Sequence, residues 1–137
     1  MIDVVLKKGK ERSLLRRHPW VYDTAVQRVG GAPASGETVR VLAFDGRPLG
    51  LGAFSPASSI RVRMWCFDCS VDVDDPLFLR RRIEAAVEAR EALLTRTNAR
   101  RLVFGEADGL PGLVVDDYDG WLVTQFQAAG VERRRDE

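Results

Sequence analysis

Residues 105–116 read Gly-Glu-Ala-Asp-Gly-Leu-Pro-Gly-Leu-Val-Val-Asp, with three glycines and a proline in the first eight positions. An apolar run, 102–104, precedes this stretch, and a second one, 113–115, ends it. Glycine adopts a positive φ angle without steric strain, and proline fixes φ at the start of a turn. The stretch therefore predicts a sharp turn that leads into a β-strand.

Length and composition limit the classes of protein to which this chain can belong. The chain has 137 residues, of which 45% are hydrophobic, so it can bury a core, and we do not expect wholesale disorder. No apolar run approaches the roughly 20 residues of a membrane-spanning helix, and residues 1–6 are too short for the apolar part of a signal peptide. We therefore expect a cytoplasmic protein.

The net charge of +1 hides an asymmetry between the two halves. Residues 1–63 carry eleven basic and five acidic side chains, a balance of +6, whereas residues 64–137 carry ten basic and fifteen acidic ones, a balance of −5. A basic half joined to an acidic half indicates that the first half meets a polyanion.

Short alternating segments dominate the first half. Strands are expected at 3–6, 21–29, 37–44, 47–54 and 60–65. Asp45-Gly46 is a two-residue hairpin signal. A helix is expected at 10–17, with Leu14 and Leu15 inward, and Pro19 ends it. Many short strands with one helix fit a small barrel.

The acidic stretch 70–75 is a natural boundary, across which we expect few contacts. Asp75 and Pro76 then open a helix as N-cap and first residue, and the helix is expected to run to about Leu94. Its apolar face is expected to carry Leu79, Ile83, Val87 and Leu94, and the arginines 80–82 fit a solvated face. Strands are expected at 101–105, 113–117 and 121–126, the last two joined at Asp119-Gly120, and a polar helix begins near 129.

Two polar clusters invite a metal assignment, and we make none. Cys66 and Cys69 form a lone C-x-x-C, and the only histidine, His18, is 48 residues upstream, so a zinc set is incomplete. The carboxylates at 116, 117 and 119 lack the spacing of a calcium loop and fit exposed turn positions.

The order of these elements resembles the N-terminal part of the large-subunit ribosomal RNA methyltransferase I family, enzymes similar to SAM-dependent cytosine-C5 methyltransferases of 23S rRNA. The segments that carry the resemblance are 7–12, His18-Pro19-Trp20-Val21-Tyr22, Gly50-Leu51-Gly52, Ser55-Pro56 with 60–63, and 105–116. The last is the most specific, and the C-x-x-C lies outside the family pattern.

The resemblance implies a mainly β fold with an α+β part. It implies a PUA-like RNA-binding β-barrel at 1–66, a linker at 67–75, and a partial strand–helix–strand (α+β) middle domain at 76–137. The Rossmann-like catalytic domain of the family, which binds S-adenosylmethionine, is absent from this sequence, so the chain looks truncated. We expect this chain alone to bind no cofactor and to methylate nothing.

The favoured function is RNA recognition, with large-subunit rRNA as the partner, a possible homodimer, and neither membrane nor DNA binding. The candidate RNA-binding residues are Lys7, Lys8, Lys10, Arg12, Arg16, Arg17, Trp20, Arg61 and Arg63. The cations would neutralise phosphates, and Trp20, like Tyr22, would stack on unpaired bases, with packing in the core as the favoured alternative for Trp20. His18 fits a structural role at the helix end better than a phosphate contact.

Two other functions remain open. A protein-interaction or dimerisation module would show an exposed apolar patch. A small stand-alone hydrolase-type enzyme would use Glu106 and Asp108 as an acid/base pair, which requires environments that separate their pKa values.

Overall fold

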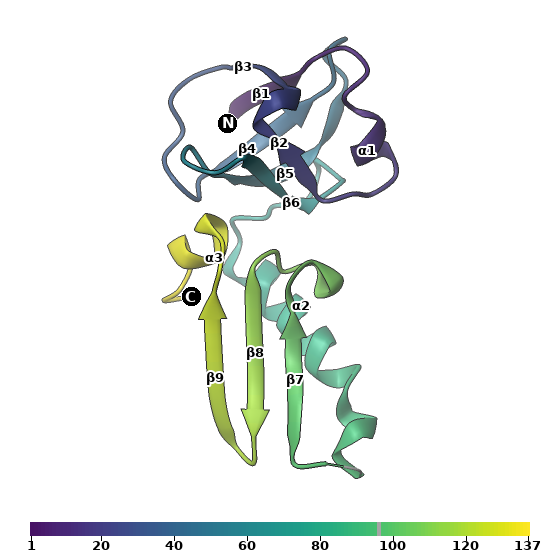
Figure 1. Cartoon of the computed structure of the whole chain (residues 1–137), viewed down its shortest axis with the longest axis vertical. Coiled ribbons are helices and arrows are strands. Elements are labelled where there is room, and N and C mark those ends of the chain that lie inside the picture. The colour runs from purple at the N-terminus through teal and green to yellow at the C-terminus, as the bar shows by residue number, and fades with distance from the viewer. Residues whose placement is uncertain (96) are drawn as a thin grey trace.

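The computed structural model describes residues 1–95 and 97–137. It contains two separate sheets, one six-stranded and one three-stranded, which lie end to end (Figure 1). The first comprises β1 (Ile2–Leu6), β2 (Trp20–Tyr22), β3 (Val26–Val29), β4 (Thr38–Leu42), β5 (Pro48–Phe54) and β6 (Ile60–Cys66). The second comprises β7 (Ala99–Phe104), β8 (Leu113–Tyr118) and β9 (Trp121–Phe126). The helices are α1 (Arg12–Leu15), α2 (Pro76–Glu88) and α3 (Ala129–Arg133), with single 3₁₀ turns at η1 (Asp23–Ala25), η2 (Glu91–Thr95) and η3 (Gly105–Asp108).

The first sheet curls into a half-barrel with the strand order β2-β6-β5-β4-β1-β3. Neighbouring strands are antiparallel, except for the parallel pair β1 and β4. The hairpin predicted at Asp45-Gly46 is confirmed: Gly46 has a φ of 85°, and the Ala43 amide donates to the Arg47 carbonyl at 2.9 Å. The mainly β class of the chain is thereby confirmed.

Helix α1 is shorter than the expected 10–17 and has one inward leucine. Leu14 is buried, but Leu15 is 57% exposed, so the inward placement of Leu15 is wrong. Successive residues of a helix point about 100° apart, and a single turn has room for only one of them in the core.

Helix α2 begins as predicted, with the Asp75 carboxylate accepting a hydrogen bond of 2.9 Å from the Leu77 amide. It ends at Glu88 rather than near 94, and η2 follows it. Leu79, Ile83 and Val87 pack on the core as expected, whereas the Leu94 side chain lies outside the described residues. The second unit is therefore α+β, with its helix followed by three strands.

Arg82 departs from the expected solvated face. Its guanidinium donates to the Trp65 carbonyl of β6 at 2.7 Å and to the Gly109 carbonyl, and it lies 4.3 Å from the centre of the Phe78 ring. Helical periodicity turns this position toward the half-barrel, while Arg80 and Arg81 stay exposed. Arg82 thus joins α2 to both sheets.

The glycine-rich turn has the predicted geometry. Gly105, Gly109 and Gly112 have φ angles of 53°, 68° and 80°. At Gly112 a Cβ atom would lie 2.4 Å from the Cβ of Ala128, so a side chain is also excluded by space. Between these glycines, Leu110 is completely buried, which anchors the turn in the core.

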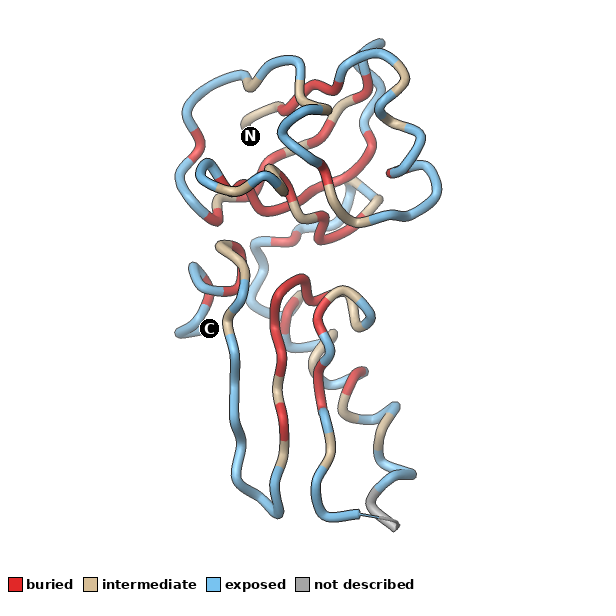
Figure 2. The backbone as a smooth tube through the Cα atoms, in the orientation of Figure 1, coloured by how far each residue is buried: buried red, intermediate tan, exposed pale blue. Residues whose placement is uncertain are grey.

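Two hydrophobic clusters form the core, and one of them extends through both sheets. The first fills the half-barrel with Val4, Leu6, Val39, Val41, Val62 and their neighbours. The second joins Leu51 and Trp65 of the half-barrel to Leu79 of α2, Val103 of β7 and Val131 of α3. In each unit, buried residues accordingly lie at the end that faces the other unit (Figure 2). The expectation of few contacts between them is wrong, because the outer face of β5 and β6 is apolar and needs a cover.

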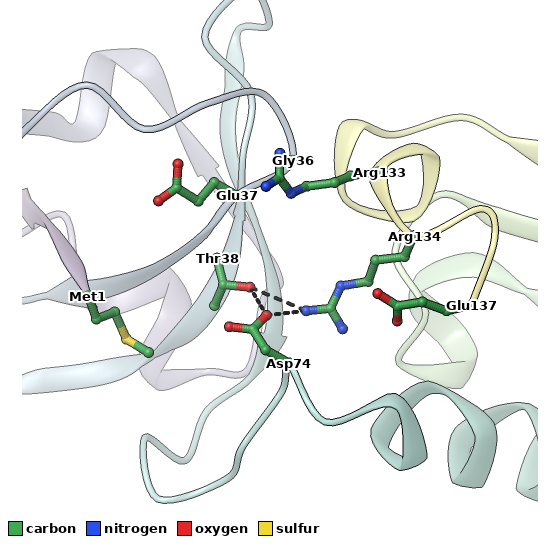
Figure 3. A pocket seen from close by; sticks show the side chains of 8 residues that line it. All are labelled: Met1, Gly36, Glu37, Thr38, Asp74, Arg133, Arg134 and Glu137. Carbon is green, nitrogen blue, oxygen red and sulfur yellow. Dashed lines mark hydrogen bonds and ion pairs between the residues drawn. The ribbon is translucent and has the colours of Figure 1, made fainter.

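Helix α3 completes this junction. A pocket of about 430 Å³ lies beside it (Figure 3), and at its wall the buried Arg134 donates to the Asp74 carboxylate, to the Val73 carbonyl, and to the Thr38 hydroxyl at 3.4 Å. Arg133 also lines the pocket, but its side chain is exposed. Gly130 fits because a Cβ there would lie 2.5 Å from Ala53 Cβ.

We predict that Arg134→Met destabilises the chain by about 3 kcal/mol, because the buried acceptors lose a charged donor. Chemical denaturation monitored by circular dichroism measures this loss. Arg133→Met is the matched control and should change stability by less than about 0.5 kcal/mol. Equal effects of the two substitutions would show that Arg134 does not hold the junction together.

Candidate nucleic-acid interface

The basic segment 7–17 is exposed on the surface of the half-barrel. The side chains of Lys7, Lys8, Lys10, Arg12, Arg16 and Arg17 are all exposed. Two of them are partly fixed: Lys7 Nζ donates to the Thr24 carbonyl at 2.8 Å, and the Arg17 guanidinium lies 5.1 Å from the centre of the Phe67 ring. The segment therefore offers several cations to a phosphate backbone.

A small pocket links this segment to β2. It encloses about 160 Å³ and is lined by Lys10 and Leu14 on one side and by Trp20 and Tyr22 on the other. The structure thus brings one of the predicted cations to the same surface depression as the two predicted aromatic residues.

Trp20 and Arg63 form a stacked pair. They are directly opposite in the register of β2 and β6, so their side chains share a face, and the Arg63 guanidinium lies 5.1 Å from the Trp20 ring centre. His18 and Tyr22 meet Trp20 edge to face, with ring centres 5.6 and 6.4 Å away. Trp20 is half-buried, so it is neither a core residue nor a free ring.

Glu106 holds this pair, and sequence reasoning did not place it there. One carboxylate oxygen, Oε1, accepts hydrogen bonds from Trp20 Nε1 and from Arg63 Nη1, each at 2.7 Å. Burial alone would raise the pKa of Glu106, but the hydrogen bond from Trp20 and the charge of Arg63 outweigh it and lower the pKa. The only sequence signal was its position in the glycine-rich turn.

His18 is exposed, and its ring nitrogen Nδ1 accepts a hydrogen bond of 3.3 Å from the Trp20 amide. This contact agrees with the structural role expected for it. His18 thereby helps to orient the residue that Glu106 binds.

Arg61 lies apart from this cluster. Its guanidinium donates to the carbonyls of Ser55 and Pro56 and lies 5.9 Å from the centre of the Phe54 ring. These contacts tie Arg61 to the loop between β5 and β6. Arg63 is thus the cation of β6 that joins Trp20.

Four of the carboxylates considered for acid/base chemistry and for metals are engaged by arginines, whereas Asp119 is exposed in its turn. Asp108 accepts a bidentate pair from Arg90 at 2.9 and 3.1 Å, and Glu106 accepts from Arg63, so an arginine holds each of these carboxylates. Asp116 pairs with Arg101 at 2.8 Å and Asp117 with Arg100 at 3.6 Å.

The two cysteines do not form a metal site either. The Cys66 thiol donates to the Asp68 carbonyl at 3.0 Å, and burial raises the pKa of the Cys69 thiol. Over residues 1–95 and 97–137, no His, Cys, Asp or Glu side chains form a group able to hold a metal ion. The same residues include no helix long and apolar enough to cross a membrane.

The curled sheet and its basic rim define a class of domain. Residues 4–67 match the family model of the PUA-like domain, which confirms the expected class for the half-barrel. The chain is 47% identical over 135 residues to the ribosomal RNA large subunit methyltransferase I of Aeromonas salmonicida and 44% identical over 136 residues to that of Escherichia coli. These matches cover 97% and 98% of this chain and 34% of each relative.

A solved structure supports the fold over the whole chain. A Streptococcus mutans protein assigned to the SAM-dependent methyltransferases superposes with a TM-score of 0.80 at 16% identity, over 99% of this chain and 35% of the other. A second structure with the same score is a methyltransferase complexed with SAH. The chain is thus similar over nearly its whole length to about one third of the length of these ribosomal RNA large subunit methyltransferases I, as the sequence resemblance implied.

We predict that Glu106→Gln destabilises the chain by about 1–2 kcal/mol at pH 7, because a charge-assisted hydrogen bond to Arg63 becomes neutral. The folded-state pKa of Glu106 is lowered, so its stabilising effect is present above the ordinary glutamate pKa of about 4.3 and is lost as the pH falls through the folded-state value. Thermal unfolding between pH 7 and pH 3 should therefore show the variant and the wild type converging at low pH.

The exposed Glu88→Gln on α2 is the matched control and should leave stability unchanged at both pH values. Asp3 and Asp116, whose pKa values are lowered by hydrogen bonds from Arg40 and Arg101, keep some acid sensitivity in every variant. A constant gap between Glu106→Gln and wild type across the pH range would contradict the role given to the carboxylate.

Proposed function

We propose that this chain is the RNA-binding portion of a SAM-dependent 23S rRNA cytosine-C5 methyltransferase and that it recognises rRNA without catalysing methyl transfer alone. One observation carries the proposal: Lys10, one of the exposed cations of 7–17, lines the same pocket as Trp20, on whose ring Arg63 lies. The sequence similarity to rRNA methyltransferases and the PUA-like match support the same role.

The two parts of this surface suit different parts of an RNA. Lysine and arginine side chains neutralise phosphates and release counterions, which gives affinity without base selectivity. Unpaired bases stack on aromatic rings and on arginine planes, which the Trp20–Arg63 pair supplies. We therefore assign contact with the backbone to Lys7, Lys8, Lys10, Arg12, Arg16 and Arg17 and base stacking to Trp20 with Arg63, while Arg61 is a peripheral contact.

The proposal includes an organisation for the rest of the molecule. We take 1–66 as the RNA-binding domain, 67–75 as a linker and 76–137 as part of a middle domain, in a cytoplasmic protein that acts on neither DNA nor a membrane. S-adenosylmethionine would bind in the two thirds of the relatives that this chain does not span. The glycine-rich turn is consistent with this assignment. Gly112 leads into strand β8, whereas a dinucleotide-binding glycine loop leads into the N-terminus of a helix.

We predict that Arg16→Ala/Arg17→Ala weakens binding to a structured large-subunit rRNA fragment and makes its salt dependence shallower. Each phosphate contact removed should reduce the slope of log K against log salt by about 0.7–0.9. Fluorescence anisotropy with labelled rRNA across a salt series measures both quantities. The control is Arg80→Ala/Arg81→Ala, a second exposed arginine pair on α2. Absence of binding at low salt, or an equal effect of the control, would refute the proposal.

A second function, assembly with another copy of the chain, is favoured by one observation. An apolar groove of about 480 Å³ lies between α2 and the edge strand β9, with Leu79, Ile83, Leu122 and Phe126 in its lining. An unpaired edge strand can pair with another strand. We propose that the homodimer forms through this groove.

We predict for this second function that sedimentation velocity shows a dimer whose population rises with protein concentration. Leu122→Arg should return the chain to a monomer, because it places a charge in the groove. The exposed Arg81→Ala on α2, outside the lining of the groove, is the control. A monomer at all concentrations up to about 100 μM would exclude self-association in the usual affinity range.

A further inference from the structure

The second sheet has one covered face and one open face. The cross-strand register places Val103, Val115 and Thr124 in one row toward α2. The alternate rows point the other way. They are Ala99–Tyr118–Trp121 at the hairpin tip, Arg101–Asp116–Val123 in the middle, and Phe104–Val114–Gln125 nearest the half-barrel. On this face the middle strand is buried at Val114 and Asp116, so the exposed side chains are at the hairpin tip and on the outer strands. Figure 1 shows α2 running along this sheet and, among the residues that the structure describes, no other helix on it below the junction.

Aromatic side chains are exposed at both ends of the open face. Trp121 is 80% exposed and its cross-strand neighbour Tyr118 is 52% exposed, while Phe104 at the other end is 55% exposed. Four strand residues separate the end rows, which corresponds to about 14 Å at the usual rise per residue. Exposed rings at such a density are uncommon unless a ligand or partner covers them.

The carboxylate on the strands of this face is neutralised, whereas Asp119, in the turn between Tyr118 and Trp121, is exposed. Asp116 is buried and neutralised by Arg101, whose guanidinium also lies 5.1 Å from the centre of the Phe104 ring. Asp117 points to the α2 side, where it pairs with Arg100. An arginine between aromatic rings offers a stacking plane and a positive charge together.

The open face is continuous along the chain with the proposed RNA surface. Phe104 ends β7, and two residues later Glu106 binds Trp20 and Arg63 of the half-barrel. Phe104 is thus the ring of this face nearest in the chain to Glu106, and Arg101 and the Tyr118–Trp121 pair lie farther along the sheet.

We propose that the open face of β7–β8–β9 is a second RNA site, which binds single-stranded RNA by stacking unpaired bases on Phe104, Tyr118 and Trp121. This inference rests on the proposed RNA-binding function and extends it from the half-barrel to the second unit. Base stacking on aromatic side chains is tolerant of sequence, because every base presents a π face. The second site thus adds affinity for unpaired RNA next to a structured element that the half-barrel holds.

The test compares Trp121→Ala with Leu77→Ala, which are two exposed apolar positions, the second on α2 and outside the lining of the groove. The probe is a labelled 12-nucleotide uridine-rich RNA, measured by fluorescence anisotropy with the full chain. Trp121→Ala should weaken binding about tenfold, Trp121→Phe should restore most of it, and Leu77→Ala should leave it unchanged. An oligonucleotide with abasic sugars in place of the bases should not distinguish Trp121→Ala from wild type.

The outcomes separate this inference from the function on which it rests. If Arg16→Ala/Arg17→Ala weakens RNA binding but Trp121→Ala does not, the open face is not an RNA site and the RNA function of the half-barrel stands. If no RNA binds at low salt, both fail. If Trp121→Ala leaves RNA binding intact and abolishes self-association in sedimentation, the open face is a protein interface and the inference is overturned.

Discussion

The carboxylate of Glu106 is the contact on which the proposed interface depends. A single oxygen accepts from the Trp20 indole and from the Arg63 guanidinium, both at 2.7 Å, and its residue belongs to the second sheet's glycine-rich turn. A guanidinium stacked on a ring can slide, so the stacking contact alone would not fix the pair. The shared carboxylate oxygen fixes it by binding both the Trp20 indole and the Arg63 guanidinium. Since the turn is anchored by the buried Leu110 and by three glycines with positive φ, the second unit sets the geometry of a surface on the first.

Local signals predicted the turns and the class of fold well. Asp45-Gly46, Asp119-Gly120 and Asp75-Pro76 encode their structures within a few residues, because positive φ angles and an N-cap are local requirements. The failures have a common cause in tertiary contact. Nothing within the 76–94 pattern shows that Arg82 faces a carbonyl of β6 and not water. Likewise, which of the two residues Leu14 and Leu15 is buried depends on how α1 packs on the half-barrel.

For the same reason, only a part of the candidate site could be predicted from the sequence. Clustering along the chain identified the cations of 7–17, and the pattern His-Pro-Trp-Val-Tyr drew attention to Trp20. The partnership of Trp20 with Arg63 follows from strand register, and that with Glu106 spans 86 residues, so neither could be read from spacing. The Streptococcus mutans structure has the same fold over 99% of this chain at only 16% identity. The arrangement of the two sheets is therefore compatible with the replacement of most side chains.

The apolar outer face of β5 and β6 has a consequence for how the molecule can be divided. Leu51, Ala53 and Trp65 are buried only because Val131 and the residues of α2 and β7 lie over them. A half-barrel expressed alone and ending at the acidic stretch would present these side chains to water and would be prone to aggregate. The smallest soluble fragment therefore has to include α3, so that the foldable piece extends to Arg133, although the first sheet ends at Cys66.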